Sequence, residues 1–119
     1  MCRQNAVWEP EKKHRAPPGW PWAKVQRFSE KPNGFYLHSL TERIESLERD
    51  CLLNGTEILD KDGQKPKRIR RFWIKRDFVV GCNRGQDTEY LMVRWNLETN
   101  GFHGFPITES DLRVRGARL

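Results

Sequence analysis

The stretch of this chain best suited to chemistry is a basic run over residues 65–76, KPKRIRRFWIKR. It holds seven Lys or Arg and no acid in twelve residues, with Phe72, Trp73 and Ile74 in its middle. A solvated tail has no need of three large apolar side chains, so the run is predicted to be a strand with a basic outer face. Cationic side chains interleaved with aromatics suit contact with a phosphate backbone.

The whole chain shares this basic character. Its 119 residues include 22 Lys and Arg against 16 Asp and Glu, which gives a formal net charge of +6. Such a charge favours a polyanionic partner, because each phosphate neutralised by a cation releases condensed counterions. A chain of this length is expected to form one domain with a single modest core.

Cysteine usage and hydropathy limit where the protein can work. Cys2, Cys51 and Cys82 are odd in number and widely spaced, and no secretory signal pattern is present. A reducing compartment is therefore expected, namely the cytoplasm, which would be that of the host cell if the protein is viral. No CxxC or HxxxH spacing occurs, so neither zinc nor another cofactor is expected. No stretch approaches the roughly 20 apolar residues of a membrane span, and the chain is expected to be soluble.

The first third of the chain is divided by its prolines. Residues 1–19 are polar and carry three prolines, so they are interpreted as a flexible basic arm outside the core. Trp8 is the exception in this arm and is expected to dock on the domain. Residues 20–28, WPWAKVQRF, alternate after Pro21 and are predicted to form a first strand.

The clearest helix signal follows a predicted turn at residues 31–34. Ser39 as N-cap and Glu42 three residues later match a capping box, and Asn54-Gly55 predicts a left-handed helix end. Apolar side chains repeat between these points at helical spacing: Leu40, Ile44, Leu47 and Cys51. The opposite face mixes acids and bases and is expected to be solvated. It carries Glu42, Arg43, Glu45, Glu48 and Arg49.

Two later strands can be read position by position. Alternation places one apolar set inward on each strand: Phe72, Ile74, Phe78 and Val80, then Leu91, Val93, Trp95 and Leu97. Residues 82–88 are predicted to be a hairpin loop, so that pairing would create an outer surface. That surface comprises Arg71, Trp73, Lys75, Tyr90 and Arg94. FHGFPI is interpreted as a short final strand or loop, and TESDLR as one helical turn from Thr108.

This order predicts an α+β fold with a small antiparallel sheet and one main helix, in which residues 20–119 form a single domain behind the arm.

The one clear helix is of mixed charge, so readout of the DNA major groove is not expected. A basic sheet suits the shape of A-form RNA, and double-stranded RNA becomes the predicted ligand. The predicted contacts combine cations with aromatics that could stack on bases. They are Trp20, Trp22, Lys24, Arg27, Lys67, Arg68, Arg70, Arg71, Trp73, Lys75, Tyr90 and Arg94. The alternative is that Trp73 and Tyr90 pack beneath the arm and the arginines are merely solvated.

Several short motifs resemble the plant-virus RNA-silencing suppressors of the tombusvirus and aureusvirus type. WPWAKVQRF, TERIESLERD and RRFWIKRDFVVGC follow the strand, helix, strand order of that family, with Thr41-Glu42 and Gly81-Cys82 in matching places. The size is similar to that of the smaller aureusvirus suppressors. The resemblance implies a homodimer that sequesters silencing duplexes on a continuous basic sheet, with tryptophans near the duplex ends.

The chain departs from that family in two ways. The tombusvirus end-capping tryptophans lie on an amino-terminal helix, whereas Trp20 and Trp22 stand among prolines here. No long carboxy-terminal helix follows, so binding indifferent to duplex length is expected.

Three other interpretations remain open. Gly19-Trp20 resembles the Gly-Trp hooks that engage Argonaute in silencing proteins and viral suppressors, with a tryptophan that anchors the arm as its alternative. TEYLMVRWN with the turn TESDLR resembles a chromo-type or SH3-like barrel that would recognise a peptide or protein. An enzyme would need clustered carboxylates or a histidine pair, whereas Asp60, Asp62 and Asp77 are scattered and His103 stands alone. A non-enzymatic binder is therefore predicted.

Overall fold

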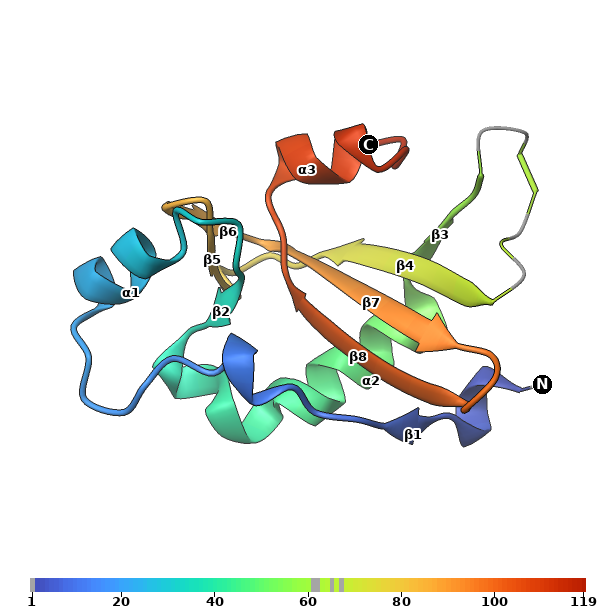
Figure 1. Ribbon diagram of the computed structural model, residues 1–119, viewed down its shortest axis with the longest axis horizontal. Helices are drawn as coiled ribbons and strands as arrows, with labels where there is room; N and C mark the ends of the chain where they lie inside the picture. The colour runs from blue at the N-terminus through green and yellow to red at the C-terminus, as the bar shows by residue number, and fades with distance from the viewer. Residues whose placement is uncertain (1, 61–62, 65, 67) are drawn as a thin grey trace.

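The computed structural model describes residues 2–60, 63–64, 66 and 68–119 and shows an α+β domain, as predicted. Its larger sheet has five strands in the order β1-β8-β7-β4-β3 (Figure 1). These strands are β1 (Val7–Trp8), β8 (Gly101–Pro106), β7 (Tyr90–Asn96), β4 (Ile69–Lys75) and β3 (Thr56–Ile58). All of its neighbouring strands are antiparallel except β1 and β8, which run parallel. The strand order is linear, with β1 and β3 at the two edges of this sheet.

The centre of the sheet is the predicted pair of strands. β4 and β7 are antiparallel over seven residue pairs, from Ile69 opposite Asn96 to Lys75 opposite Tyr90. Phe72 and Val93 face one another in this register and are both buried. The predicted inward faces of the two strands are therefore confirmed at their centre. FHGFPI adds β8 on the other side of β7, which settles the choice between strand and loop.

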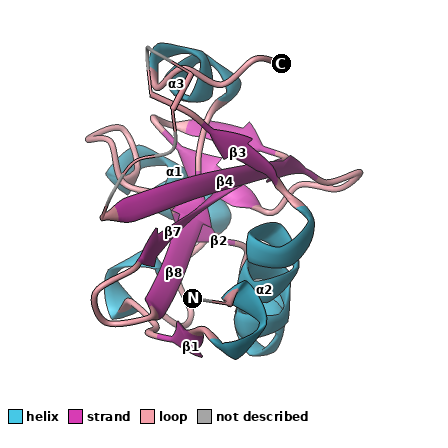
Figure 2. Cartoon of the chain, turned by 90° about the vertical axis from the view of Figure 1, so that its right-hand side faces the viewer, coloured by secondary structure: helices cyan, strands magenta, loops and turns pink. Residues whose placement is uncertain are grey.

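One face of the sheet is covered by helix α2 (Ile44–Asn54) and the 3₁₀ helix η3 (His38–Arg43) that leads into it (Figure 2). The predicted helical stripe is confirmed, because every member is buried in the main core. These residues are Leu40, Ile44, Leu47 and Cys51.

The predicted caps of this helix are wrong, although the helix does end at Asn54 as predicted. The 3₁₀ turn begins after Leu37, and no side chain caps it, so Ser39 does not act as the N-cap. Gly55 has a φ of −72°, not a left-handed conformation, because the chain must pass directly into the extended β3. A glycine fits there for another reason: a Cβ would stand 2.4 Å from the Cys51 carbonyl oxygen and 2.7 Å from that of Trp73.

The predicted hairpin loop at residues 82–88 is itself a small hairpin of β5 (Gly81–Asn83) and β6 (Gln86–Thr88). Arg84 and Gly85 both have positive φ, of 51° and 76°, as a two-residue type I′ turn requires. β5 also pairs with β2 (Phe35–Tyr36), which completes the three-stranded sheet.

Residues 20–28 do not form the predicted strand. They contain helix α1 (Trp22–Phe28), which follows Pro21 at its N-cap. Ala, Lys, Gln and Arg are good helix formers, and proline is readily accommodated at the start of a helix. Val25 is fully buried one turn before Ser29, whose hydroxyl accepts from the Gly85 amide at 2.9 Å. A nine-residue stretch is too short for its apolar side chains to distinguish a helix from a strand, and packing against β5 selected the helix.

The amino-terminal residues were predicted to form an arm outside the core, and this prediction is wrong. They lie against the domain. β1 extends the sheet beside β8, and Ala6 and His14 are buried. Arg3, in the 3₁₀ helix η1 (Arg3–Asn5), donates to the Leu52 carbonyl near the end of α2 at 3.2 Å. Trp8 docks as predicted. These contacts join segments far apart in the chain, which a local reading of prolines and polar residues does not reveal.

Glu48 is the main correction to the predicted solvated face of α2, because it is only 2% exposed. Its carboxylate accepts from Trp8 Nε1 at 2.9 Å, from the Tyr36 hydroxyl at 2.5 Å and from the Gly104 amide at 2.9 Å. Burial raises the pKa of Glu48 from 4.5 to about 7, although these hydrogen bonds act in the opposite direction. The buried carboxyl thus links α2 to β1, β2 and β8.

The other face of the sheet is partly covered by α3 (Glu109–Val114), the predicted turn after Thr108. The Thr108 hydroxyl caps it by accepting from the Asp111 amide at 3.2 Å. Leu112 and Ala117 pack with Ile58 and Met92 in a second, smaller core. The sheet therefore has a core on each side, and α3 stands at one end of its second face (Figure 1).

Replacing Phe72 with Ala is expected to lower the free energy of unfolding by about 3–5 kcal/mol, because it removes a large buried side chain and leaves a cavity. Urea denaturation followed by circular dichroism measures the loss. Val114→Ala is the control, since Val114 is 85% exposed and its truncation should change stability by less than about 0.5 kcal/mol. Equal midpoints for the two variants would show that Phe72 is not in the core.

Glu48 predicts a pH dependence of stability. Its folded-state pKa of about 7 lies above its ordinary value of 4.5, so its contribution is complete below pH 4.5 and is lost as the pH rises through 7. Glu48→Gln should remove up to about 3 kcal/mol of this decline between those pH values. Urea midpoints across that range measure it, with Glu45→Gln, an exposed acid of the same helix, as control. If Glu48→Gln loses as much stability over this pH range as the wild type does, the raised pKa of Glu48 is contradicted.

Candidate nucleic-acid interface

The face of the sheet opposite α2 carries the predicted outer residues. The register sets Arg71 opposite Arg94, and Lys75 opposite Tyr90. Directly paired residues of antiparallel strands share a face, and Trp73 lies on it between Arg71 and Lys75. The five residues predicted to form one surface therefore do lie on one face.

This surface is not an open basic sheet with free aromatics. Trp73 and Tyr90 pack beside Met92 and Phe105 against the small core that α3 completes. The Tyr90 hydroxyl donates to Glu109 at 3.2 Å. The alternative in which Trp73 and Tyr90 pack beneath another segment thus describes the structure, except that the segment is α3 and not the arm.

Three arginines gather beside these aromatics, and we refer to Arg71, Arg94 and Arg115 as the arginine triad. Arg71 and Arg94 are opposite one another on β4 and β7, while Arg115 follows α3. The Arg115 guanidinium lies 5.8 Å from the centre of the Phe105 ring. Burial, together with the charges of Arg71 and Arg94, lowers the pKa of Arg115. The three cations are therefore close enough to repel one another.

No member of the triad forms an ion pair with an acid of the described chain. The Nε atoms of Arg71 and Arg94 are buried and have no hydrogen-bond partner within residues 2–60, 63–64, 66 and 68–119. Other arginines do find acids: Arg49, Arg68, Arg70, Arg76, Arg84 and Arg113. Like charges placed opposite one another in a sheet are destabilising. Repulsion within the triad thus lowers the stability of the fold, and a bound anionic ligand would offset that repulsion.

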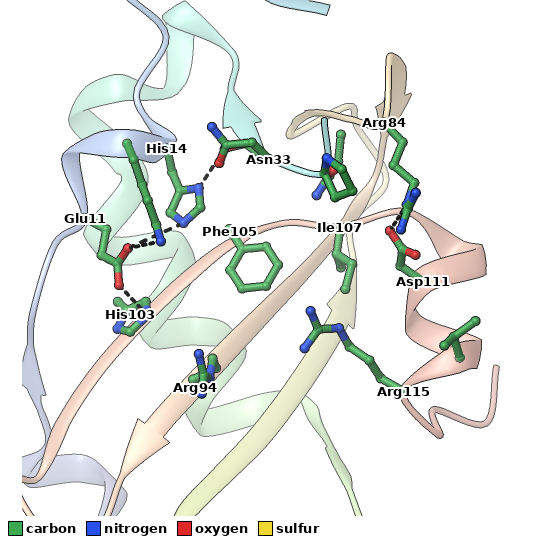
Figure 3. Close-up of a pocket in the computed structure, with 15 residues that line it drawn as sticks. Glu11, His14, Asn33, Arg84, Arg94, His103, Phe105, Ile107, Asp111 and Arg115 are labelled. Atoms are coloured by element: carbon green, nitrogen blue, oxygen red, sulfur yellow. Dashed lines mark hydrogen bonds and ion pairs between the residues drawn. The ribbon is translucent and has the colours of Figure 1, made fainter. Parts of the chain in front are cut away.

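A cavity of about 510 Å³ opens at the triad, and Arg94, Arg115 and Phe105 help to line it. In Figure 3 the Arg115 side chain extends from the end of α3 back across the sheet toward Phe105. The opposite wall comes from the 3₁₀ helix η2 (Lys12–His14) and the turn at residues 32–34. Cationic, aromatic and backbone groups therefore converge on one hollow.

Two histidines meet at this cavity through Glu11. The Glu11 carboxylate lies 2.8 Å from His103 Nε2 and 3.1 Å from Lys13 Nζ, and more distantly, at 3.8 Å, from His14 Nε2. Burial lowers the pKa of both His14 and His103. His14 Nδ1 donates to the Gly34 carbonyl at 2.8 Å, and its ring stacks on Phe105. The pair of histidines that the sequence did not reveal thus exists in the fold.

The tryptophans predicted to contact RNA lie elsewhere, at α1 (Figure 1). Lys24 Nζ is 4.2 Å from the centre of the Trp20 ring, which also contacts Phe28. Trp22 Nε1 donates to Asp87 at 2.8 Å, and Arg27 is exposed. Trp20, Trp22, Lys24 and Arg27 therefore form a second cluster, which we call the α1 cluster.

The remaining predicted contacts are not part of the triad. Arg70 lies on the α2 side of β4, where it makes two hydrogen bonds of 2.7 Å to Glu57 and is largely covered. Arg68 is 82% exposed and pairs with Glu98 at 3.4 Å. Lys75 is exposed and lies 3.8 Å from Glu89. Lys67 falls outside the residues that the structure describes.

Reading the sequence missed Arg115, Lys13, His14 and His103 as members of one site. The alternation of β8 could have indicated that His103 and Phe105 share the Arg94 face. No local signal places Lys13 or Arg115 there, because both depend on how distant segments pack.

Within the described part of the chain, no group of three or more His, Cys, Asp or Glu is arranged to hold a metal ion, and Cys2, Cys51 and Cys82 are free thiols. The described helices are all too short or too polar to cross a lipid bilayer. Comparison of the chain with protein-family models, curated protein sequences and solved structures finds no match. The case for a function therefore depends on the arrangement of the residues themselves.

Replacing Arg94 with Met is expected to raise the free energy of unfolding at low ionic strength by roughly 0.2–1 kcal/mol, because it removes one of two like charges directly opposite in the sheet. The gain should shrink in 1 M NaCl, where the screening length falls to about 3 Å. Urea denaturation at both salt concentrations measures the effect. Arg43→Met, at an exposed position that precedes α2, is the control. A lower free energy of unfolding for Arg94→Met than for the wild type at low salt would contradict repulsion between Arg71 and Arg94.

Proposed function

We propose that this protein is a non-enzymatic binder of double-stranded RNA that contacts phosphates through the arginine triad. The observation that carries the proposal is the gathering of Arg71, Arg94 and Arg115 on one face, with no acid paired to them among residues 2–60, 63–64, 66 and 68–119. Guanidinium groups bind phosphate oxygens through two parallel hydrogen bonds, and they keep their charge at any physiological pH. A phosphate chain would offset the repulsion that the fold leaves in place.

A sheet that presents arginines supports RNA over DNA as the ligand. Readout of the DNA major groove commonly uses a helix with base-contacting side chains, and α2 instead buries its apolar stripe and the Glu48 carboxyl. Duplex RNA offers phosphates and 2′-hydroxyls across a wide, shallow minor groove that proteins contact by shape. Binding independent of sequence is therefore part of the proposal.

The α1 cluster supports a role in sequestering silencing duplexes, the activity of the plant-virus suppressors that the sequence resembles. In the tombusvirus proteins the end-capping tryptophans lie on an amino-terminal helix, and here Trp22 is the first residue of α1. Gly81-Cys82 begins the separate strand β5 and does not end β4, which weakens that part of the resemblance. Suppression of RNA silencing by a viral protein in the cytoplasm of the host cell is the biological form of the proposal.

A homodimer belongs to the same proposal, whereas an Argonaute hook at Gly19-Trp20 does not. A homodimer would extend the sheet through an edge strand, and β1 and β3 stand at the two edges of the larger sheet. Gly19 has a φ of +80°, while Trp20 is covered by Lys24 and Phe28, which favours a role for this tryptophan as an anchor over an Argonaute hook.

The histidine pair does not change the non-enzymatic assignment. A ribonuclease that uses two histidines needs each of them free to exchange a proton with the RNA. Here Glu11 lies 2.8 Å from His103, and His14 is only 7% exposed with Nδ1 donating to a carbonyl. The pair is therefore better suited to holding Glu11 in place than to cleaving a strand.

Replacing Arg71 and Arg94 together with Ala is expected to weaken binding of a duplex RNA regardless of its sequence. The slope of log affinity against log salt should fall in magnitude by about 2, because roughly one counterion is released for each phosphate contact. Fluorescence anisotropy with two unrelated duplexes over a salt series measures both quantities, after circular dichroism has shown that the variant is folded.

Arg43→Ala serves as the control, because Arg43 is an exposed arginine of the helix layer and its removal lowers the net charge without touching the triad. A single-stranded RNA and a DNA duplex of the same sequence test the choice of ligand. Unchanged affinity and salt slope in the folded double variant would overturn the proposed interface, and absence of duplex RNA binding by the wild type would overturn the function.

A further inference from the structure

The cavity beside the triad has more positive than negative charge once its internal pairs are counted. Arg84 and Lys13 line it, but each already has an acid: Asp111 lies 2.6 Å from Arg84, and Glu11 lies 3.1 Å from Lys13. Both acids of the lining are thus engaged. The two guanidinium groups of Arg94 and Arg115 have no acid partner in the part of the chain that the structure describes, so an occupant with about two negative charges would neutralise the site.

The same cavity contains an unused acceptor. Asn83 is 4% exposed, and its Nδ2 donates to the Pro106 carbonyl at 2.9 Å, which fixes the orientation of its amide. Its Oδ1 is buried and has no partner among the described residues, as is also true of Arg94 Nε. An unsatisfied buried polar atom is costly, so the complementary occupant carries a donor as well as negative charge.

A phosphate monoester meets both requirements. At neutral pH it carries between one and two negative charges and three oxygens that guanidinium groups bind well. A hydroxyl on the attached sugar, or on the phosphate in its singly ionised form, supplies the donor for Asn83. The diester inside an RNA strand carries a single charge and continues on both sides, which suits the face of the sheet at Arg71 better than a hollow lined by η2 and α3.

Size and lining agree with this class of ligand. A volume of about 510 Å³ lies within the range of roughly 300–1,000 Å³ typical of small-molecule sites. Phe105 and Ile107 supply an apolar part of the lining, and His14 stacks on Phe105 at 5.2 Å between ring centres (Figure 3). The guanidinium groups of Arg94 and Arg115 suit the phosphate of a nucleotide, and the apolar wall beside them suits the sugar and base that extend from it.

We infer that the cavity lined by Arg94, Arg115 and Asn83 is a binding site for a phosphate monoester. The group is either the terminal phosphate of an RNA strand or that of a free mononucleotide. The first source rests on the proposed RNA-binding function, whereas the second does not. In the RNA case the cavity anchors the strand end while the triad holds internal phosphates.

The test uses isothermal titration calorimetry with AMP, inorganic phosphate and adenosine, and anisotropy with one RNA duplex bearing either 5′-phosphate or 5′-hydroxyl ends. AMP is expected to bind while adenosine does not, and the 5′-phosphorylated duplex is expected to bind about ten-fold more tightly. Arg115→Met should abolish the AMP signal and the end preference. Arg118→Met, which removes an exposed arginine outside this cavity, should preserve both.

The outcomes separate this inference from the RNA-binding proposal. A preference for the phosphorylated duplex identifies an RNA end as the ligand, and AMP binding without that preference identifies a free mononucleotide. If neither AMP nor phosphate binds and the two duplexes bind equally, the inference is overturned, while tight binding of the hydroxyl-ended duplex leaves RNA binding intact. Arg71→Ala should weaken both duplexes alike without removing the end preference, because Arg71 does not line this cavity.

Discussion

The pairing of β4 with β7 is the constraint on which the rest of the structure depends. Seven residue pairs in one register send Phe72 and Val93 to the α2 side and bring Arg71 and Arg94 together on the other. A shift of one residue would exchange the two faces, placing arginines in the main core and phenylalanine beside the cavity. The hydrophobic side chains thus set the register, and the charged site follows from it. Folding therefore forces together two like charges that do not stabilise one another.

The fold treats its buried charges in two different ways. Glu48 is enclosed, but three donors from separate segments surround its carboxylate, so the group becomes part of what joins α2 to the sheet. Arg71 and Arg94 keep buried Nε atoms without partners in the part of the chain that the structure describes. Satisfied buried polar groups make a structure specific, whereas unsatisfied ones indicate a ligand or a functional site. The triad, and not Glu48, therefore has the properties of a ligand site.

Helix α3 changes how the basic face can be used. Because Leu112 packs on the sheet beside Met92, Trp73 and Tyr90 pack against a small core, and the cations of this face are left to contact a partner. The same segment carries Arg115 to the triad and, with η2 and the turn at residues 32–34, encloses the cavity. A surface suited to stacking on bases is thereby replaced by one suited to phosphates. The tryptophans of the α1 cluster, Trp20 and Trp22, also pack on a core, beside Val25 and Phe35.

The sequence by itself determined the two faces of β4 and β7, the apolar stripe of α2 and the helical turn after Thr108, because each depends on alternation or spacing within a few residues. It left β8 open between a strand and a loop. It misassigned α1, since the apolar residues of so short a stretch fit either period. It placed Glu48 in solvent because the partners of this carboxylate come from β1, β2 and β8. The cavity was decided by tertiary structure alone. Lys13, Arg94 and Arg115 meet there only because the amino-terminal segment and α3 pack against the same sheet. No local pattern in the sequence predicts contacts between segments so far apart in the chain.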